Sequence, residues 1–308
     1  MIERDETFGG SWPYEARYFE GNGFRHHYVD EGIKDSAETF VCLHGEPTWG
    51  YLYRNFIPRL GELGRVVVPD HMGFGKSETP QDREYSVEEH CDNLAALLLA
   101  LDVRDATLVM HDWGGPIGTN FAVRHPDRVK RIFYIDSFSR IGIPAGVDMA
   151  VLMKEGNTPW AQFFTTEEFD PVMSHLSRTI LSVLKLVGFE NNDVITEEWI
   201  RAYAAPFPTP ESCKGAKAFP LHTQNPASFA YFEAAMKAPG VIDALSAKPA
   251  MTVMGAEDRT LPGVLSKGML HEIWPDAPYI ELPDVGHYAP EDAPSALLEI
   301  LGNFVAST

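Results

Sequence analysis

The stretch Thr107-Leu-Val-Met-His-Asp-Trp-Gly-Gly-Pro-Ile-Gly118 carries the strongest signal for the fold. It begins as an apolar run, which is typical of a strand buried on both faces of a parallel sheet. A helical segment at 116–123 follows after a tight turn, and Asp112 falls at that turn. This order of strand, turn and helix is typical of a nucleophile elbow, which holds one side chain exposed above the sheet. An Asp in this place could also cap the helix, but the His-Asp-Trp-Gly-Gly context favours the elbow.

Short apolar runs alternate with helical segments on both sides of this stretch. Buried strands are predicted at 39–43, 65–69, 107–110, 131–135, 250–254 and 279–282, and residues 24–31 resemble the second arm of a hairpin. Ser86 and Glu89 form a capping box that opens a helix to residue 101, and a last helix is expected over 293–305. Alternating strands and helices predict an α/β fold with a mostly parallel, doubly wound sheet.

One long segment interrupts this alternation after the sixth strand. Residues 140–217 contain no convincing buried strand, but helical pieces at 160–169, 172–187 and 196–202. We therefore expect a main domain of residues 1–139 and 218–308, with residues 140–217 forming a helical cap. The cap should cover the carboxyl edge of the sheet, where α/β folds bind their ligands.

Composition narrows the class of protein. The 308 residues carry a net charge of −19, which disfavours binding to nucleic acid or to anionic membranes. No apolar run approaches the roughly 18 residues of a membrane helix, and the three cysteines do not suggest a disulfide framework. We therefore expect a cytoplasmic protein. No histidine pair has metal-ligand spacing, so no metal site is predicted.

The residue types at the elbow point to nucleophilic catalysis by a carboxylate. Asp112 is ionised at neutral pH, with a reference pKa of about 3.9, and needs no base before it attacks. Attack at a saturated carbon would give an alkyl ester on the enzyme, which water must then hydrolyse. His287, in the Val-Gly-His context after the last predicted strand, is the expected base for that water.

Two further groups complete the predicted site. Asp258 follows the preceding strand and would orient His287 in the chain order of the α/β-hydrolases, while Asp136, at the end of another strand, is the alternative acid. The turn at His44-Gly45 would aim the backbone N–H of Glu46 at the elbow. Together with the N–H of Trp113 it would form an oxyanion hole.

These residues together resemble the haloalkane dehalogenases, which are α/β-hydrolases with a helical cap. The similar motifs are His44-Gly-Glu-Pro-Thr-Trp49 with Tyr51-Leu-Tyr-Arg54, Asp70-x-x-Gly-Phe-Gly-Lys-Ser77, His111-Asp-Trp-Gly-Gly-Pro116, Ala204-Ala-Pro-Phe-Pro208 and Gly286-His287. They spread over most of the chain. His-Asp-Trp-Gly-Gly also occurs in epoxide hydrolases, whereas the first pair of motifs is more specific to dehalogenases.

The resemblance implies the roles of the site residues. Asp112 would be the nucleophile and His287 the base, and Trp113 would be one of two N–H donors for the departing halide. In one branch of the family the second donor is an Asn at the position of Glu46, which cannot donate when ionised. The other branch uses a cap tryptophan; Trp160 is expected here, with Trp199 as the alternative.

The resemblance also implies the reaction and its partners. The expected substrates are a small halogenated alkane and water, the products are alcohol, halide and proton, and no cofactor takes part. The protein would be a monomer or a small homo-oligomer. The alternative enzyme is an epoxide hydrolase, in which Tyr203 of the cap would act as the acid, and a non-catalytic binding protein of the same fold is the alternative from another class.

Overall fold

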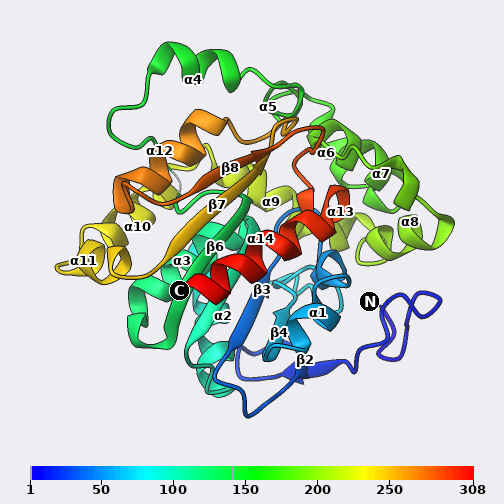
Figure 1. Cartoon of the computed structure of the whole chain (residues 1–308). Helices are drawn as coiled ribbons and strands as arrows, with labels where there is room; N and C mark the ends of the chain where they lie inside the picture. Colours follow the sequence, from blue (N-terminus) through cyan, green and yellow to red (C-terminus); the bar gives the residue numbers. More distant parts are fainter. Residues whose placement is uncertain (1, 141) are drawn as a thin grey trace.

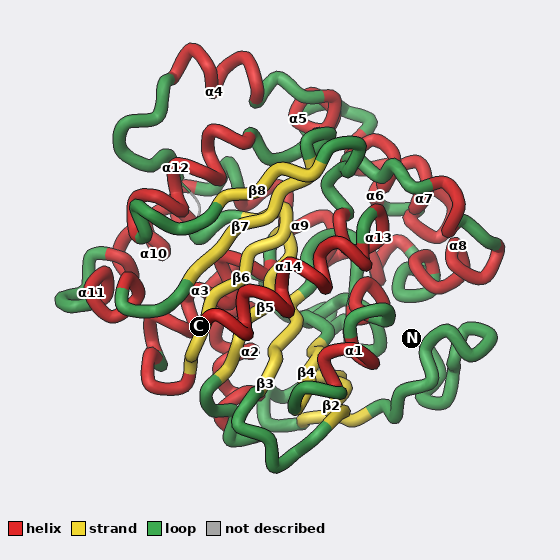
Figure 2. Tube along the Cα trace, in the orientation of Figure 1, coloured by secondary structure: helices red, strands yellow, loops and turns green. Residues whose placement is uncertain are grey.

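The core of the protein is an eight-stranded sheet with strand order β1-β2-β4-β3-β5-β6-β7-β8 (Figures 1 and 2). The computed structural model describes residues 2–140 and 142–308. The strands are β1 Arg17–Phe19, β2 His26–Gly32, β3 Thr39–Leu43, β4 Arg65–Pro69, β5 Ala106–Asp112, β6 Val129–Ser137, β7 Ala250–Gly255 and β8 Tyr279–Leu282. β3 to β8 pair in parallel, and β2 pairs antiparallel with β1 and β4. The predicted fold class is therefore confirmed, including the hairpin at the start.

Helices cover both faces of the central strands. Residues that point to either face are therefore buried, and an almost unbroken run of apolar residues is expected there. All residues of β3 and β5 are buried. Three strands have the predicted bounds, but β5 and β6 extend beyond their apolar runs through polar residues at their carboxyl ends, including Asp112 and Asp136. The ladder continues there because Asp112 still pairs with Ser137 across a register shift.

Helices cover both faces of the sheet. α1 Ile57–Gly61 and α14 Pro294–Ser307 lie across the face turned to the viewer in Figure 1, and α2 Val87–Ala100 and α3 Gly114–Arg124 pack together behind it. α12 Gly263–Ile273 packs beside β7, and the short α13 Ala289–Asp292 precedes α14. The hydroxyl of Ser86 accepts the backbone N–H of Glu89 at 3.1 Å, as the capping box predicts. The carboxylate of Glu89, however, accepts from Tyr85.

All the regular elements that the structure describes between β6 and β7 are helices. This segment contains α4 Met149–Glu155, α5 Pro159–Phe163, α6 Phe169–Met173, α7 Leu176–Val187, α8 Glu197–Ala204, α9 Lys214–His222, α10 Pro226–Met236 and α11 Val241–Ser246. In Figure 1, α5 and α6 lie near the carboxyl ends of β7 and β8, α4 lies above α12, and α7 and α8 lie further to the right. The proposed cap boundary at residue 217 falls inside α9, and α10 and α11 pack against α3. The division into a main domain and a cap stays a prediction.

Two predicted cap helices are broken in the structure. The helix expected over 160–169 ends at Phe163, because the hydroxyls of Thr165 and Thr166 bond back to carbonyls three residues earlier. Threonine side chains that take up carbonyls in this way compete with continued helix. The helix expected over 172–187 is divided near His175, whose ring bonds to the carbonyl of Pro171.

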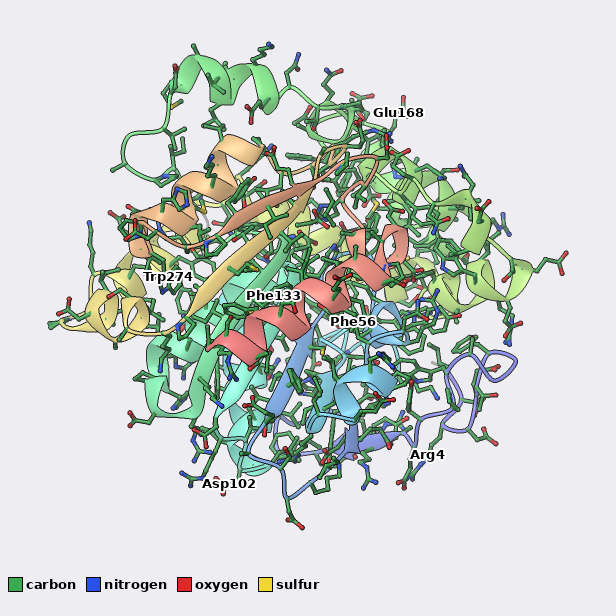
Figure 3. The ribbon with its side chains drawn as sticks, in the orientation of Figure 1. Arg4, Phe56, Asp102, Phe133, Glu168 and Trp274 are labelled. Carbon is green, nitrogen blue, oxygen red and sulfur yellow. The ribbon has the colours of Figure 1, made fainter. Side chains whose placement is uncertain are left out.

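Large side chains fill the space on both sides of the sheet. Phe56 and Phe133 are fully buried among them, whereas Arg4, Asp102 and Glu168 lie at the periphery (Figure 3). Among the described residues, no helix is long and apolar enough to cross a membrane.

Candidate active site

Asp112 lies at the turn from β5 to α3, as the elbow predicts. Its backbone is in the left-handed region, with φ of +48°, which is uncommon for a residue other than glycine and is often found at functional sites. One carboxylate oxygen, Oδ2, accepts the backbone N–H of Glu46 at 2.8 Å. The nearby backbone N–H of Trp113 also acts to lower the pKa of this carboxyl group. The two N–H groups expected at the oxyanion hole therefore both face Asp112.

The loop after β3 reaches Asp112 because residue 45 is a glycine. A Cβ atom at Gly45 would overlap Oδ2, Cβ and Cγ of Asp112. Burial raises the pKa of Asp112, while the charge of His287 and the N–H groups of Glu46 and Trp113 oppose that rise. The Asp112 carboxylate is thus held in a pocket of low polarity by a few specific partners.

His287 lies on the loop after β8, between Asp112 and Asp258. Its Nδ1 is 2.8 Å from Oδ2 of Asp258, and its Nε2 is 3.8 Å from Oδ1 of Asp112. Burial alone would lower the pKa of His287, but the charges of Asp258 and then Asp112 outweigh it and raise that pKa to about 9. The structure thus brings together the three side chains that the sequence analysis had selected from three separate loops.

Thr260 is a site residue that the sequence analysis missed. Its hydroxyl is 2.8 Å from Oδ1 of Asp258 and 2.9 Å from Nδ1 of His287. The same Asp258 oxygen accepts the backbone N–H groups of Thr260 and Leu261. An Asp followed two residues later by Thr is the local signal for such an Asx-type turn, and this turn aims the second oxygen of Asp258 at the histidine.

Asp136, the alternative acid, has different partners. Its two carboxylate oxygens accept the backbone N–H groups of Gly255, at 2.6 Å, and of Ala289, at 3.1 Å. Full burial, and next the charge of Asp258, raise the pKa of Asp136 well above its usual range. Asp136 therefore joins the end of β7 to the start of α13, and Asp258 is the carboxylate bonded to the His287 ring.

A cavity of about 360 Å³ opens beside Asp112 and His287. Its wall is largely apolar and includes Phe138, Ile143, Trp160, Phe229, Leu265 and Met269. These residues come from the segment directly after β6 and from α5, α10 and α12, and sequence reasoning identified only Trp160 among them. Apolar wall residues look like ordinary core residues in a sequence, so no local signal could have found the others.

The two candidate cap tryptophans have different surroundings. Trp160 lines the cavity together with Trp113. Trp199 stacks on Phe189, with ring centroids 5.0 Å apart, and packs edge-on against Tyr203. The hydroxyl of Tyr203 donates to Glu291, which also pairs with Arg54. Trp160 and Asp112 therefore line the same cavity, whereas Trp199 packs against Phe189 and Tyr203, and Tyr203 joins α8 to α13 through Glu291.

Glu46 contributes a carboxyl group to the cavity wall. It is 4% exposed, and within residues 2–140 and 142–308 its Oε1 has no hydrogen-bond partner. Burial, and then the charge of Asp112, raise the pKa of Glu46 well above its usual range. Burial thereby favours the neutral form of Glu46 over the ionised form. A neutral carboxyl group can donate a hydrogen bond.

Within the described residues, no group of three or more His, Cys, Asp or Glu side chains is arranged to hold a metal ion. The polar groups of the site are the Asp112, His287 and Asp258 side chains, Thr260, Glu46 and the indoles. They can supply a nucleophile, a base and N–H donors.

This arrangement of fold and site agrees with the comparisons to known proteins. The chain belongs to the alpha/beta hydrolase fold family, whose sequence profile matches residues 38–294. It is 32% identical over 300 residues to a haloalkane dehalogenase of Psychrobacter cryohalolentis, covering 93% of this chain and 89% of that protein. It is 33% identical over 258 residues to one from Mycolicibacterium paratuberculosis, covering 81% and 79%. Within the fold family, these relatives place it among the haloalkane dehalogenases.

A further relative and two solved structures complete the comparison. A cis-3-alkyl-4-alkyloxetan-2-one decarboxylase of Shewanella oneidensis is 39% identical over 128 residues, covering 41% of this chain and 39% of that protein. The tetrameric haloalkane dehalogenase DpaA from Paraglaciecola agarilytica NO2 superposes with a TM-score of 0.74 at 28% identity, covering 97% of this chain and 94% of that one. A loop variant of the dehalogenase DbeA from Bradyrhizobium elkanii, at 24% identity, has a TM-score of 0.78 with coverages of 95% and 97% and supports the fold.

Proposed function

We propose that this protein hydrolyses haloalkanes to an alcohol, a halide ion and a proton through a covalent ester on Asp112. The observation that carries the proposal is the position of Asp112 at the wall of an apolar cavity, between two N–H donors and His287. Oδ2 accepts the N–H of Glu46, so Oδ1, which faces Nε2 of His287 at 3.8 Å, is the attacking oxygen. Oδ1 forms a bond to the halogen-bearing carbon as the carbon–halogen bond breaks and the halide leaves with the bonding electrons.

The halide needs hydrogen-bond donors as it leaves, because an uncompensated charge in an apolar cavity is very costly. The indoles of Trp113 and Trp160 both line the cavity, and N–H donors that are already in place stabilise a developing anion without moving a proton. We assign them as the halide-binding pair. The carboxyl group of Glu46 lies on the same wall, and its raised pKa favours the neutral form, which would be a further donor.

The second half of the reaction returns Asp112 to its free form. His287 takes a proton from a water molecule, and the water oxygen attacks the ester carbon, Cγ of Asp112. The oxygen that becomes negative in the tetrahedral intermediate is Oδ2, which already accepts from the N–H of Glu46. Asp258 holds the imidazole in place and stabilises its protonated form. The Cγ–Oδ1 bond then breaks, the departing oxygen takes the proton from His287, and the alcohol leaves; the carboxyl group that remains on Asp112 loses its proton to solvent.

The direct test is halide release from 1-bromobutane and 1,2-dibromoethane, with the ester followed by isotope labelling. In a single turnover in H₂¹⁸O, the label should enter Asp112 first and reach the alcohol only in later turnovers. His287→Gln should release about one equivalent of halide and accumulate an alkyl-enzyme detectable by mass, since an ionised Asp112 attacks without a base. Label found only in the first alcohol would contradict the covalent route.

The oxetanone decarboxylase similarity supports a second candidate, ring opening of a dialkyl β-lactone at the same cavity. Carbon dioxide release from a cis-3,4-dialkyl oxetan-2-one, without halide release from haloalkanes, would favour it. The epoxide hydrolase alternative depended on Tyr203, whose hydroxyl donates to Glu291. Diol formation from 1,2-epoxyhexane in the same assay measures that activity directly.

A further inference from the structure

The turn at residues 188–191 follows α7, and we call it the cap turn. It contacts both loops that carry the catalytic candidates Asp258 and His287. The backbone N–H of Arg259 donates to the carbonyl of Val187 at 3.2 Å, and its guanidinium bonds to the carbonyl of Lys185 and pairs with Glu190. On the other loop, a Cβ atom at Gly286 would overlap the carbonyl oxygen of Gly188. The cap turn therefore lies directly against the backbone of the residue before His287.

One carboxylate joins this cap turn to the histidine loop. Oδ2 of Asp292 accepts the backbone N–H of Gly286 at 2.8 Å. Oδ1 of the same group accepts the backbone N–H groups of Glu190, at 3.0 Å, and Asn191, at 2.8 Å. Burial raises the pKa of Asp292, and these three N–H groups oppose the rise. A charge-assisted bond to each side makes Asp292 the link between two segments that are about a hundred residues apart in sequence.

Besides the ring contacts of His287, side chains of the described residues bond to the backbone of this loop at Gly286, His287 and Ala289. Nε2 of His111 bonds to the carbonyl of His287 at 2.8 Å, and Asp136 accepts the N–H of Ala289 at 3.1 Å. His111 and Asp136 belong to the central strands β5 and β6 and are fully buried. Asp292 bonds to Gly286, on the cap side. The backbone around His287 is thus bonded to the central sheet on one side and, through Asp292, to the cap turn on the other.

We propose that Asp292 is a positioning residue, through which the cap turn at 188–191 holds His287 in place for hydrolysis of the ester on Asp112. The inference rests on the proposed function, because it assumes that His287 is the base. Nε2 of His287 is 3.8 Å from Oδ1 of Asp112, and the attacking water must fit against both groups. A displacement of about 1 Å in such an arrangement can cost roughly 100-fold in rate.

The test compares Asp292→Asn and Asp292→Ala with a matched control, Glu190→Gln. The control removes the ion pair with Arg259 on the same cap turn but keeps the backbone N–H that Asp292 accepts. With 1-bromobutane, the Asp292 variants should keep the rate of the first halide burst and lose roughly 100-fold in steady-state turnover, with alkyl-enzyme accumulating. Glu190→Gln should behave as the wild type. A burst that slows together with turnover would indicate a merely structural role and overturn the proposal.

Hydrogen exchange provides a measurement that does not depend on activity. In Asp292→Asn, the amides of Gly286, Glu190 and Asn191 should all exchange faster, while those of β5 stay protected as in the wild type. Unchanged exchange at Gly286 would overturn the coupling between cap and loop. If the wild type releases no halide but these amides respond together, the proposed function fails while the link through Asp292 stands, so the two outcomes are distinguishable.

Discussion

In the proposed reaction the pKa of His287 has to change, and the charge of Asp112 controls that pKa. In the resting enzyme burial lowers the pKa of His287, but Asp258 and Asp112 raise it to about 9, so the ring is a cation at neutral pH. In the proposed mechanism, alkylation would convert Asp112 into a neutral ester and remove one of those charges. We predict that ester hydrolysis rises with pH through an apparent pKa clearly below 9. Single-turnover decay of the alkyl-enzyme against pH measures it, with NMR titration of His287 in the free enzyme as the reference. An identical pKa in both states would contradict this reasoning.

The roles of the two proposed halide donors, Trp113 and Trp160, can be tested residue by residue. Loss of one charge-assisted hydrogen bond costs about 1.5–3 kcal/mol, and each 1.36 kcal/mol is tenfold in rate. Trp160→Phe should therefore slow the first halide burst by roughly 10- to 150-fold and reduce quenching of tryptophan fluorescence by bromide. Trp199→Phe is the matched control, because Trp199 stacks on Phe189, and it should leave the burst rate near that of the wild type. The reverse pattern would assign the donor to Trp199, and a normal burst in both variants would leave Glu46 as the donor to test.

At the level of elements, the site depends on how closely the β3 loop approaches the β5–α3 elbow. A Cβ atom at Gly45 would overlap the Asp112 carboxylate. Gly45→Ala should displace the N–H of Glu46 and lower kcat by at least the roughly 100-fold cost of one lost oxyanion-hole donor. Gly302→Ala is the control: it lies in α14, where an added Cβ atom has open space. It should raise the free energy of unfolding by about 0.5–1 kcal/mol. Normal turnover in Gly45→Ala would show that the N–H of Glu46 is dispensable.

For the molecule as a whole, buried neutral histidines make stability depend on pH. Burial lowers the pKa of His26 and of His90 to about 3. Below about pH 6.5 these histidines therefore bind protons in the unfolded chain but stay neutral in the folded chain. Stability should therefore fall as the pH drops from 6.5 towards 3, by up to about 1.4 kcal/mol per pH unit for each such histidine. His287 acts in the opposite sense because its pKa is raised to about 9 in the folded chain. Its protonation stabilises the folded state fully below about pH 6.5, and this stabilisation is lost as the pH rises through 9.

Replacement of one buried histidine tests this origin of acid sensitivity. Neither ring nitrogen of His90 has a hydrogen-bond partner within the described residues, and its ring packs on Phe219 with centroids 4.6 Å apart. His90→Phe should flatten the pH dependence of the unfolding free energy between pH 6 and 4 by about one histidine's share. Urea unfolding at several pH values measures it, with His175→Phe, an exposed histidine, as the control. An unchanged slope in His90→Phe would locate the acid sensitivity elsewhere.

The sequence alone determined the strand order along the chain, the elbow at Asp112 and the identity of the nucleophile, base and acid candidates. These features depend on local sequence patterns. Continuous apolar runs indicate buried strands, glycines indicate a tight turn, and polar residues directly after a strand indicate candidate site residues. Only the tertiary structure decided which carboxylate bonds to His287, because Asp258 and Asp136 follow strands that are adjacent in the sheet. It also decided that Trp160 lines the cavity and Trp199 does not. Partners of this kind are selected by packing between segments far apart in sequence, and burial then sets the protonation of groups such as Glu46, which no local pattern records.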